Sequence, residues 1–257
     1  MIPRQVARTG PVRSEIVTYD IHFHFDPVCP FAWLTSRWVQ QVADQRDYAV
    51  DWRFISLRIL NKHIDYDAHF PPEYEEGHTN GLRLLRVCAK ARADHGRELM
   101  GPLYTALSAS LWDVPPPEDK EAHRRFTASA AQVEPILAEL DLPVSLADAL
   151  EDTSWDDEIE AETEDALSRT GRDVGTPIIH FEPPDGVAFF GPVISRLPSD
   201  EDAVRLWDHV VGLAGFPGFA ELKRSLRELP QLQVLGVDLG EAGVEQDWHA
   251  GSRRLEK

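Results

Sequence analysis

Cysteine is scarce in this sequence: the 257 residues include two, Cys29 and Cys88. Two cysteines do not build a disulfide scaffold, and a reducing compartment keeps such thiols free. Cys88 follows Leu84 and Leu85 at helical spacing, so we expect it to be a small apolar residue of a helical core. The alternative is a redox pair between the two cysteines, which requires a short distance between them.

Basic residues are also few. The chain has 26 lysines and arginines and 44 acidic residues, which gives a net charge of −18. A field of this sign repels nucleic acid and anionic membranes, so we expect neither as a partner. No stretch approaches the apolar length of a membrane span, and residues 1–10 lack the apolar core of a signal peptide. These absences predict a cytoplasmic protein, which we expect to be a monomer or a homodimer.

The stretch around Cys29 joins two segments whose apolar residues repeat with different periods. Before it, Tyr19 to Phe25 alternates as in a strand, which we expect over residues 16–25. After it, apolar residues recur at every fourth position as in an amphipathic helix over residues 30–45, with Pro30 at the first helical position. A sulfur at such a junction faces free backbone N–H groups and the positive end of the helix dipole. Both favour the reactive thiolate, so we predict a nucleophile; the alternative is a small buried cysteine.

The rest of the chain predicts an α/β protein with one long helical block. A strand over residues 49–55 completes a parallel βαβ unit. From about residue 71 to 169 the pattern is helical, with helices expected over 74–94, 98–110, 120–140, 145–150 and 154–169. A strand over 175–181 carries Pro177 near its start, a turn at 183–186 leads into a hairpin partner over 187–190, and helices follow over 199–211 and 216–229.

These segments resemble the DsbA-like branch of the thioredoxin superfamily, and within it the mycothiol-dependent nitroreductases and thiol oxidoreductases. The residues that carry the resemblance are 23–38 around Cys29, 56–61, 102–106, 173–180, 187–193 and 221–224. The resemblance implies a thioredoxin fold with an inserted all-helical domain. It divides the chain into a thioredoxin-like domain of residues 15–62 and 170–229, a helical insertion of 63–169, and flexible terminal segments of 1–14 and 230–257. It also implies a cis bond before Pro177 and places that proline against Cys29.

The chain departs from this family at Ala32, where the family carries a second cysteine. In a Cys-x-x-Cys enzyme the second thiol resolves the mixed disulfide, and alanine does not do so. We therefore predict a monothiol oxidoreductase in which Cys29 works with a low-molecular-weight thiol, mycothiol or glutathione, as co-substrate. The resemblance extends its substrates to disulfides and small electrophiles such as nitroaromatics.

Two other classes of function use the same parts. Kappa-type glutathione transferases and chromene carboxylate isomerases share the DsbA-like frame, and a thiol-dependent cis–trans isomerase or transferase involves no net redox change. Such an enzyme does not require a second cysteine. The third class is a thioredoxin-like binding module without activity.

Eleven residues accompany the catalytic Cys29 as candidates for binding the thiol or the substrate. Asp26 is either a proton acceptor or a cap of its own turn, and Phe31 and Trp33 are either walls for an aromatic substrate or core residues. The histidines at 22 and 24 share one strand face and raise the question of a metal, but no further ligand cluster accompanies them, so we expect none. The full set is His24, Asp26, Pro30, Phe31, Ala32, Trp33, Asn61, Gly175, Thr176, Pro177 and Phe190.

Overall fold

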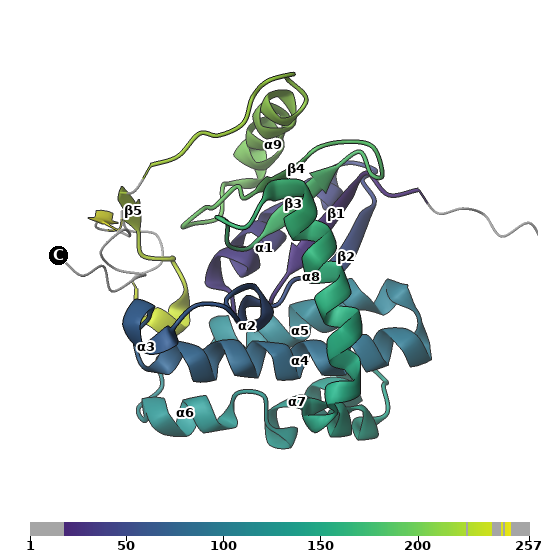
Figure 1. Ribbon diagram of the computed structural model, residues 1–257, viewed down its shortest axis with the longest axis vertical. Helices are drawn as coiled ribbons and strands as arrows, with labels where there is room; N and C mark the ends of the chain where they lie inside the picture. Colours follow the sequence, from purple (N-terminus) through teal and green to yellow (C-terminus); the bar gives the residue numbers. More distant parts are fainter. Residues whose placement is uncertain (1–17, 225, 238–242, 244, 248–257) are drawn as a thin grey trace, which may run out of the picture.

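A four-stranded sheet in the order β2-β1-β3-β4 forms the centre of the protein (Figure 1). The computed structural model describes residues 18–224, 226–237, 243 and 245–247. The strands are β1 (Ile21–Phe25), β2 (Val50–Phe54), β3 (Ile178–Phe181) and β4 (Ala188–Phe190). β1 and β2 are parallel and are joined through α1 (Pro30–Gln45), whereas β3 runs antiparallel to both β1 and β4.

A helical block lies between β2 and β3 in the sequence and below the sheet in Figure 1. Together with the βαβ unit and the β3–β4 hairpin, it confirms the thioredoxin fold with a helical insertion. The domain boundaries stay a prediction. The elements of the block are α2 (Leu57–Leu60), α3 (Tyr66–His69), α4 (Glu73–His95), η1 (Arg97–Leu99), α5 (Met100–Trp112), α6 (Lys120–Phe126), α7 (Ala130–Glu139), η2 (Val144–Glu151), η3 (Thr153–Trp155) and α8 (Asp156–Thr170).

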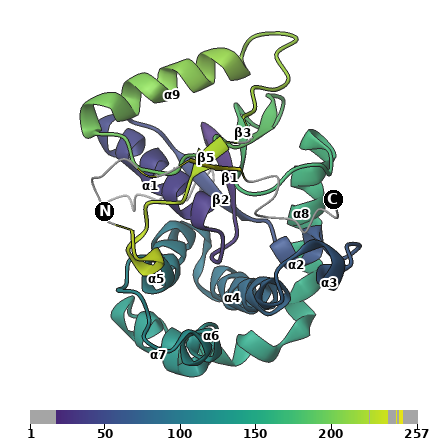
Figure 2. The same cartoon turned by 90° about the vertical axis from the view of Figure 1, so that its left-hand side faces the viewer.

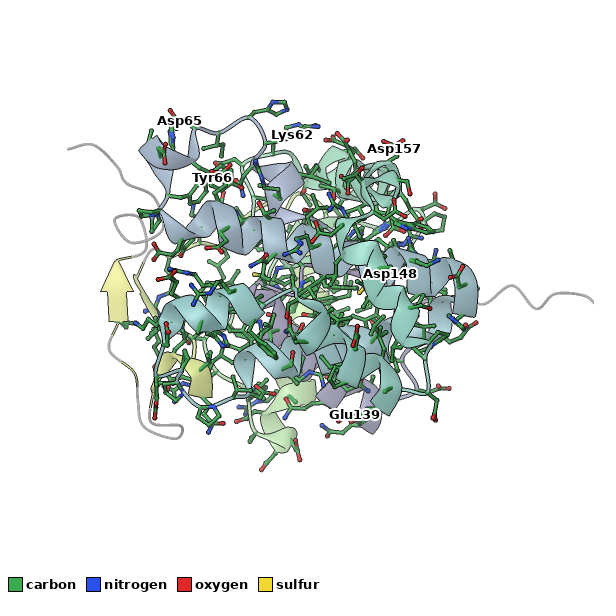
Figure 3. The ribbon with its side chains drawn as sticks, turned by 90° about the horizontal axis from the view of Figure 1, so that it is seen from below. Lys62, Asp65, Tyr66, Glu139, Asp148 and Asp157 are labelled. Carbon is green, nitrogen blue, oxygen red and sulfur yellow. The ribbon has the colours of Figure 1, made fainter. Side chains whose placement is uncertain are left out.

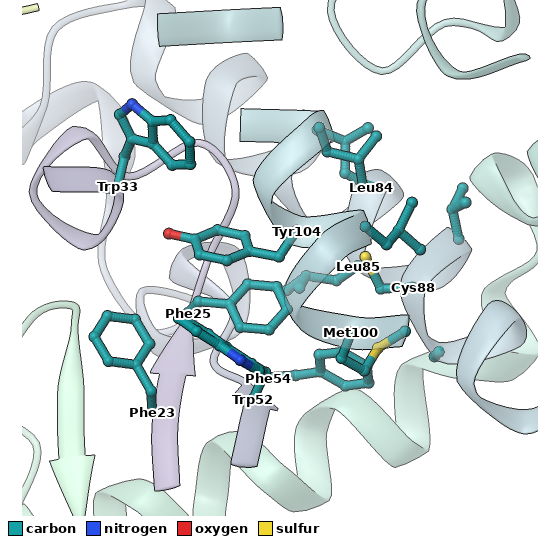
Figure 4. Close-up of a cluster of buried hydrophobic side chains, with 14 of the residues drawn as sticks. Phe23, Phe25, Trp33, Trp52, Phe54, Leu84, Leu85, Cys88, Met100 and Tyr104 are labelled. Carbon is teal, nitrogen blue, oxygen red and sulfur yellow. The ribbon is translucent and has the colours of Figure 1, made fainter. Parts of the chain in front are cut away.

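Alternation along the strands sends large apolar side chains to one face of the sheet. Phe25 stacks on Tyr104 of α5 with ring centroids 4.1 Å apart, and it meets Phe54 at 5.8 Å (Figure 4). Trp38 of α1 contacts Trp207 of α9 (Asp200–Ala214). Both rings are fully or almost fully buried. Figure 2 shows α9 and the helical block on opposite sides of α1 and the strands. One continuous core therefore joins the sheet to the block.

The other face of the sheet packs against α8 through polar pairs and a small second hydrophobic cluster that includes Ile178, Ala166 and Leu167. Asp51 and Arg53 of β2 pair with each other, and Arg53 also faces Asp165 of α8. Side chains of α8 also protect the edge strand β2, because Glu162 Oε2 accepts from Phe54 N at 2.8 Å and Thr163 Oγ1 accepts from Ser56 N at 3.1 Å. A strand edge whose N–H groups are capped in this way is closed to further strand pairing.

Two of the expected helices differ from the observed ones. The helix expected over 120–140 is divided into α6 and α7, because Ala128 takes a φ of +58° and Ser129 caps the new helix by accepting from Gln132 N. The helix expected over 216–229 is wrong: Gly218 has a φ of +88°, and the chain continues to a short strand, β5 (Leu226–Glu228).

Beyond β5, the described part of the C-terminal segment contains η4 (Gln233–Leu235) and β6 (Glu245–Asp247), which pairs antiparallel with β5. The expected flexibility of residues 1–14 concerns residues outside those described, as does much of residues 230–257. None of the described helices is long and apolar enough to cross a membrane. Acidic side chains, among them Asp65, Glu139, Asp148 and Asp157, are exposed on the helical block (Figure 3).

Candidate active site

Cys29 occupies the junction between β1 and α1. It is the N-cap of α1, with an extended backbone at φ −92°, and Pro30 follows as the first helical residue. The Cys29 amide donates to Asp26 O at 3.0 Å, which closes the tight turn after β1. The turn aims the sulfur at the start of the helix, where Cys29 Sγ accepts from Ala32 N at 3.4 Å. The local sequence therefore gives the expected junction and the expected contact with a helix N–H.

The same sulfur is buried, since Cys29 is 5% exposed. Burial raises the pKa of the Cys29 thiol to about 11, because desolvation of the thiolate outweighs the hydrogen bonds that would stabilise it. The prediction of a thiolate in the resting protein is therefore wrong. The helix end is present, but one backbone N–H does not replace the water that the buried sulfur has lost. At rest Cys29 is a thiol that donates to Thr176 O at 3.6 Å.

The loop before β3 lies against Cys29. The Thr176–Pro177 bond is cis, as the resemblance implied, and the carbonyl of Thr176 accepts from Cys29 Sγ. Thr176 is 4% exposed, and its side chain lies close enough to Cys29 to lower the pKa of the thiol, although its buried Oγ1 makes no hydrogen bond of good geometry among the described residues. A buried hydroxyl without a well-formed hydrogen bond is costly, and the role of Thr176 in binding stays a prediction.

The β3–β4 hairpin fixes this loop from the other side. Phe190 lies over Gly175, where an added Cβ would stand 3.4 Å from the phenyl ring. Gly191 N donates to Pro177 O at 2.8 Å, and Thr35 of α1 donates to Pro192 O at 2.8 Å. Phe190 itself is 37% exposed. The tertiary structure thus brings Gly175, Thr176, Pro177 and Phe190 to the Cys29 end of α1.

Asp26 is fully buried and connects the Cys29 turn to the helical block. Its carboxylate accepts from Val28 N at 3.1 Å and from Leu57 N, the first residue of α2, at 2.8 Å. Burial raises the pKa of Asp26 to about 7, although the two backbone hydrogen bonds lower it. When ionised, Asp26 raises the pKa of Cys29 further. Both of its predicted roles therefore persist: it caps its own turn, and it titrates near neutral pH.

The residues that flank Ala32 have different environments. Ala32 is fully buried, and its amide donates a hydrogen bond to Cys29 Sγ. Pro30 and Phe31 are half-buried. Trp33 is 2% exposed and donates from Nε1 to Asp113 at 3.0 Å. Trp33 also meets Tyr104 edge-on, with ring centroids 6.2 Å apart (Figure 4). Of the two readings of Trp33, the structure supports the core residue.

Two candidates make no contact with Cys29. Asn61 is 5% exposed and donates to Leu57 O at 2.8 Å, so it closes the short helix α2. His24 is fully buried on the α8 face of the sheet, next to Ile178 in register, and neither ring nitrogen has a hydrogen-bond partner among the described residues. Burial lowers the pKa of His24 to about 3, so the ring is neutral at physiological pH. Their roles in binding stay predictions.

Sequence reasoning missed two tyrosines beside the site. Tyr104 is fully buried and its hydroxyl makes no hydrogen bond of good geometry, although Ser36 and Ser108 lie nearby. Burial raises the pKa of Tyr104, and the charge of Cys29 contributes to this shift. Burial also raises the pKa of Tyr74 on α4, with a contribution from Cys29. Both residues come from the helical block, and no spacing in the sequence relates them to Cys29.

The remaining alternatives concern Cys88 and a metal. Both cysteines are free, and Cys88 is fully buried on α4 in the common core, as predicted. Burial raises the pKa of Cys88 to about 12, which makes it inert. Among residues 18–224 and the other described positions, no group of three or more His, Cys, Asp or Glu side chains is arranged to hold a metal ion.

Comparison with known proteins agrees with this geometry. A family model described as Rv2466c-like, mycothiol-dependent nitroreductase Rv2466c, matches residues 28–224. This span is more than half of the chain and contains Cys29, the helical block and the Thr176–Pro177 loop. The chain belongs to this family. This membership confirms the predicted resemblance to the mycothiol-dependent nitroreductases.

A curated relative is the uncharacterized protein Rv2286c of Mycobacterium tuberculosis, which is 31% identical over 206 residues, or 79% of this chain and 81% of that protein. Among solved structures, the cytosolic disulfide reductase DsbM from Pseudomonas aeruginosa aligns with a TM-score of 0.43 and 17% identity, covering 76% of this chain and 99% of its own. A 2-hydroxychromene-2-carboxylate isomerase aligns with a TM-score of 0.48 and 14% identity, covering 75% and 95%.

Proposed function

We propose that this protein is a monothiol oxidoreductase in which Cys29 exchanges with a low-molecular-weight thiol and reduces a disulfide or a small electrophile. The observation that carries the proposal is the position of Cys29 Sγ, which lies between the first turn of α1 and the carbonyl of Thr176. Ala32 leaves Cys29 without a resolving thiol in its own loop. A second thiol from solution must therefore complete each cycle.

In disulfide reduction, the Cys29 sulfur attacks R–S–S–R, forms a Cys29–S–S–R mixed disulfide and releases R–S⁻, while the thiol proton goes to solvent or to the leaving sulfur. A free thiol R′–SH then attacks the mixed disulfide, so that R′–S–S–R leaves and Cys29 regains its proton. A second R′–SH converts R′–S–S–R to R′–S–S–R′ and R–SH, so the net reaction is R–S–S–R + 2 R′–SH → 2 R–SH + R′–S–S–R′. Binding of the partner replaces the contact between Cys29 and Thr176 O. An extended thiol can then use the backbone of Thr176 and its buried Oγ1.

The family description points to mycothiol as the thiol and to a nitro compound as an electrophile. The balanced first step is ArNO₂ + 2 RSH → ArNO + RSSR + H₂O. Cys29 would carry one of the two sulfurs as a mixed disulfide between turnovers. Glutathione is the other candidate thiol, and rates measured with each thiol in turn distinguish them. Free thiols of this kind persist in the cytoplasm, which is where we propose the protein acts.

Intact-mass analysis after incubation with oxidised mycothiol or glutathione tests the monothiol step. We expect one adduct on the wild type, the same adduct on Cys88→Ser, and none on Cys29→Ser. An Ala32→Cys variant should lose the adduct and form an internal disulfide, because residue 32 lies in the first turn of α1 and its amide already contacts Cys29 Sγ. Turnover that persists at full rate in Cys29→Ser would reject both this function and covalent isomerisation.

A thiol-dependent cis–trans isomerase or a kappa-like transferase is the second candidate. The protonated state of Cys29 favours it, because a buried S–H can donate a hydrogen bond to a bound thiol without itself attacking. An isomerase returns its thiol unchanged, a transferase consumes one thiol per product, and a reductase converts two thiols to a disulfide. Measuring thiol and disulfide together during turnover therefore separates the three.

A further inference from the structure

A hollow of about 510 Å³ lies at the edge of the sheet, away from Cys29. It is bounded by the start of the edge strand β2, by α1 and by the beginning of α5. Arg37 lines it from α1, eight residues after the Cys29 N-cap, which is about 12 Å along the helix axis. Asp51, Trp52, Arg97, Glu98 and Gly101 also line the hollow.

Arg37 is a half-buried cation without a counter-ion. No carboxylate of the described residues lies within ion-pairing distance of it, although the chain has 44 acidic residues. Its guanidinium stacks on Trp33 at 4.4 Å and donates to Thr105 Oγ1 at 2.8 Å, while its buried Nε has no acceptor. Burial lowers the pKa of Arg37, which the more distant charges of Asp113 and Asp44 offset in part.

The arginines of the helical block, by contrast, are paired. Arg86 meets Asp156 at 2.6 Å, and Arg92 meets Glu158 at 2.6 Å. Arg37 is only half-buried, but a partly desolvated charge without a counter-ion in so acidic a chain still indicates a place for an external anion.

A second donor faces the same hollow. Trp52 is 9% exposed, and its indole N–H makes no hydrogen bond to the described residues. A Cβ added at Gly101 would lie 2.8 Å from Trp52 Nε1, so the glycine keeps the approach to this N–H free of a side chain. Figure 4 shows Trp33 and Trp52 on opposite sides of the Tyr104 ring.

The acidic residues of the hollow do not cancel the charge of Arg37. Asp51 is 2% exposed and is neutralised by Arg53 at 2.8 Å and by Arg97 at 2.8 Å. Glu98 is exposed, so water screens its charge. The hollow is therefore left with a half-buried guanidinium that has no counter-ion and with the indole N–H of Trp52.

We propose that this hollow binds a small organic anion whose carboxylate or phosphate group pairs with Arg37 and whose flat apolar part lies against Trp52. Guanidinium groups bind both kinds of anion through paired N–H donors, so the shared chemistry is an oxyanion on an aromatic or other flat body. The site is separate from the thiol chemistry of Cys29, and its occupancy is measured without any turnover.

The test follows the Trp52 indole N–H signal by NMR in the full-length protein, with Trp52→Phe identifying the signal. Benzoate and phenyl phosphate are the two anionic probes, and benzyl alcohol is the neutral one. We expect at least one anion to shift the Trp52 signal saturably at millimolar concentration while benzyl alcohol does not. The stronger of the two anions identifies the carboxylate or the phosphate as the preferred group.

Arg37→Met should weaken binding of that anion about tenfold or more, since a hydrogen-bonded charge pair is lost. Arg205→Met, which removes an exposed arginine of α9, should leave binding unchanged. Arg37→Lys keeps the positive charge but lacks the paired N–H donors of the guanidinium, so it should bind several-fold more weakly than the wild type. This variant also tests the proposal if the methionine variant does not fold. Absence of a saturable shift with both anions, equal binding of benzyl alcohol, or undiminished binding by Arg37→Lys would overturn the proposal.

Discussion

Cys29 should react slowly with iodoacetamide at neutral pH, despite its place at a helix N-terminus. Burial raises its pKa to about 11, so at pH 7.5 about 0.03% of the sulfur is thiolate, compared with about 9% for an ordinary cysteine. Because the thiolate is the form that reacts, the expected rate is about 300-fold below that of the same cysteine in the unfolded chain.

The assay follows the mass of a Cys88→Ser variant during alkylation between pH 6.5 and 10.5, with and without denaturant. The rate in the folded protein should rise about tenfold per pH unit with no plateau below pH 10. Asp26→Asn removes a charge that raises the pKa of Cys29, so its profile should shift to lower pH. A plateau with a midpoint near or below pH 7.5 would show that the helix end dominates over burial, and would refute the reasoning.

Three further outcomes are expected. His24 has a pKa of about 3 in the folded protein, below its ordinary value, so its contribution to stability should be full above pH 6.5 and fall as the pH drops toward 3, by about 3 kcal/mol at pH 4.5. Urea unfolding of His24→Leu should show less of this loss, the exposed His209→Gln should show all of it, and equal losses in both would contradict the assignment. Gly81→Ala should lower the unfolding free energy by about 1–3 kcal/mol, because its Cβ would lie 2.5 Å from Asp26 Oδ1. Gly77→Ala, on the same helix with nothing within 4 Å, should instead raise it by up to about 1 kcal/mol, and similar effects at the two sites would argue against the close contact. Because the pKa of Asp26 is raised to about 7, its ionisation should lower the stability as the pH rises from about 4 to about 7; Asp26→Asn should flatten this decrease, and an unchanged pH profile would assign the decrease to another group.

Much of the fold could be predicted from local pattern. The change from alternation to helical spacing at Cys29 located the end of β1 and the start of α1, and the structure has both within the expected stretch. The errors fall where a few residues override a periodic pattern. Ser129 begins a new helix inside the expected one, and Gly218 directs the chain away from a helix that apolar residues alone would favour.

The candidate site was predictable in part. The place of Cys29 and the proline loop followed from the motif and the resemblance, and the structure brings them together. Trp33 instead packs in the core and donates to Asp113, and Asn61 donates to the backbone at the end of the short helix α2. The two tyrosines that interact electrostatically with Cys29 come from helices distant in sequence; the resemblance included the segment around Tyr104, but the local pattern did not place either ring near the sulfur.

The sequence alone determined where the sulfur lies along the chain: after a strand, before a helix, and without a second cysteine at residue 32. The tertiary structure decided the protonation state of that sulfur. Ionisation depends on the water that surrounding elements exclude, and those elements are contributed by the helical block and the loop before β3. Local sequence can supply a helix N–H for a thiolate, but only the packed structure determines how much solvation the thiolate loses.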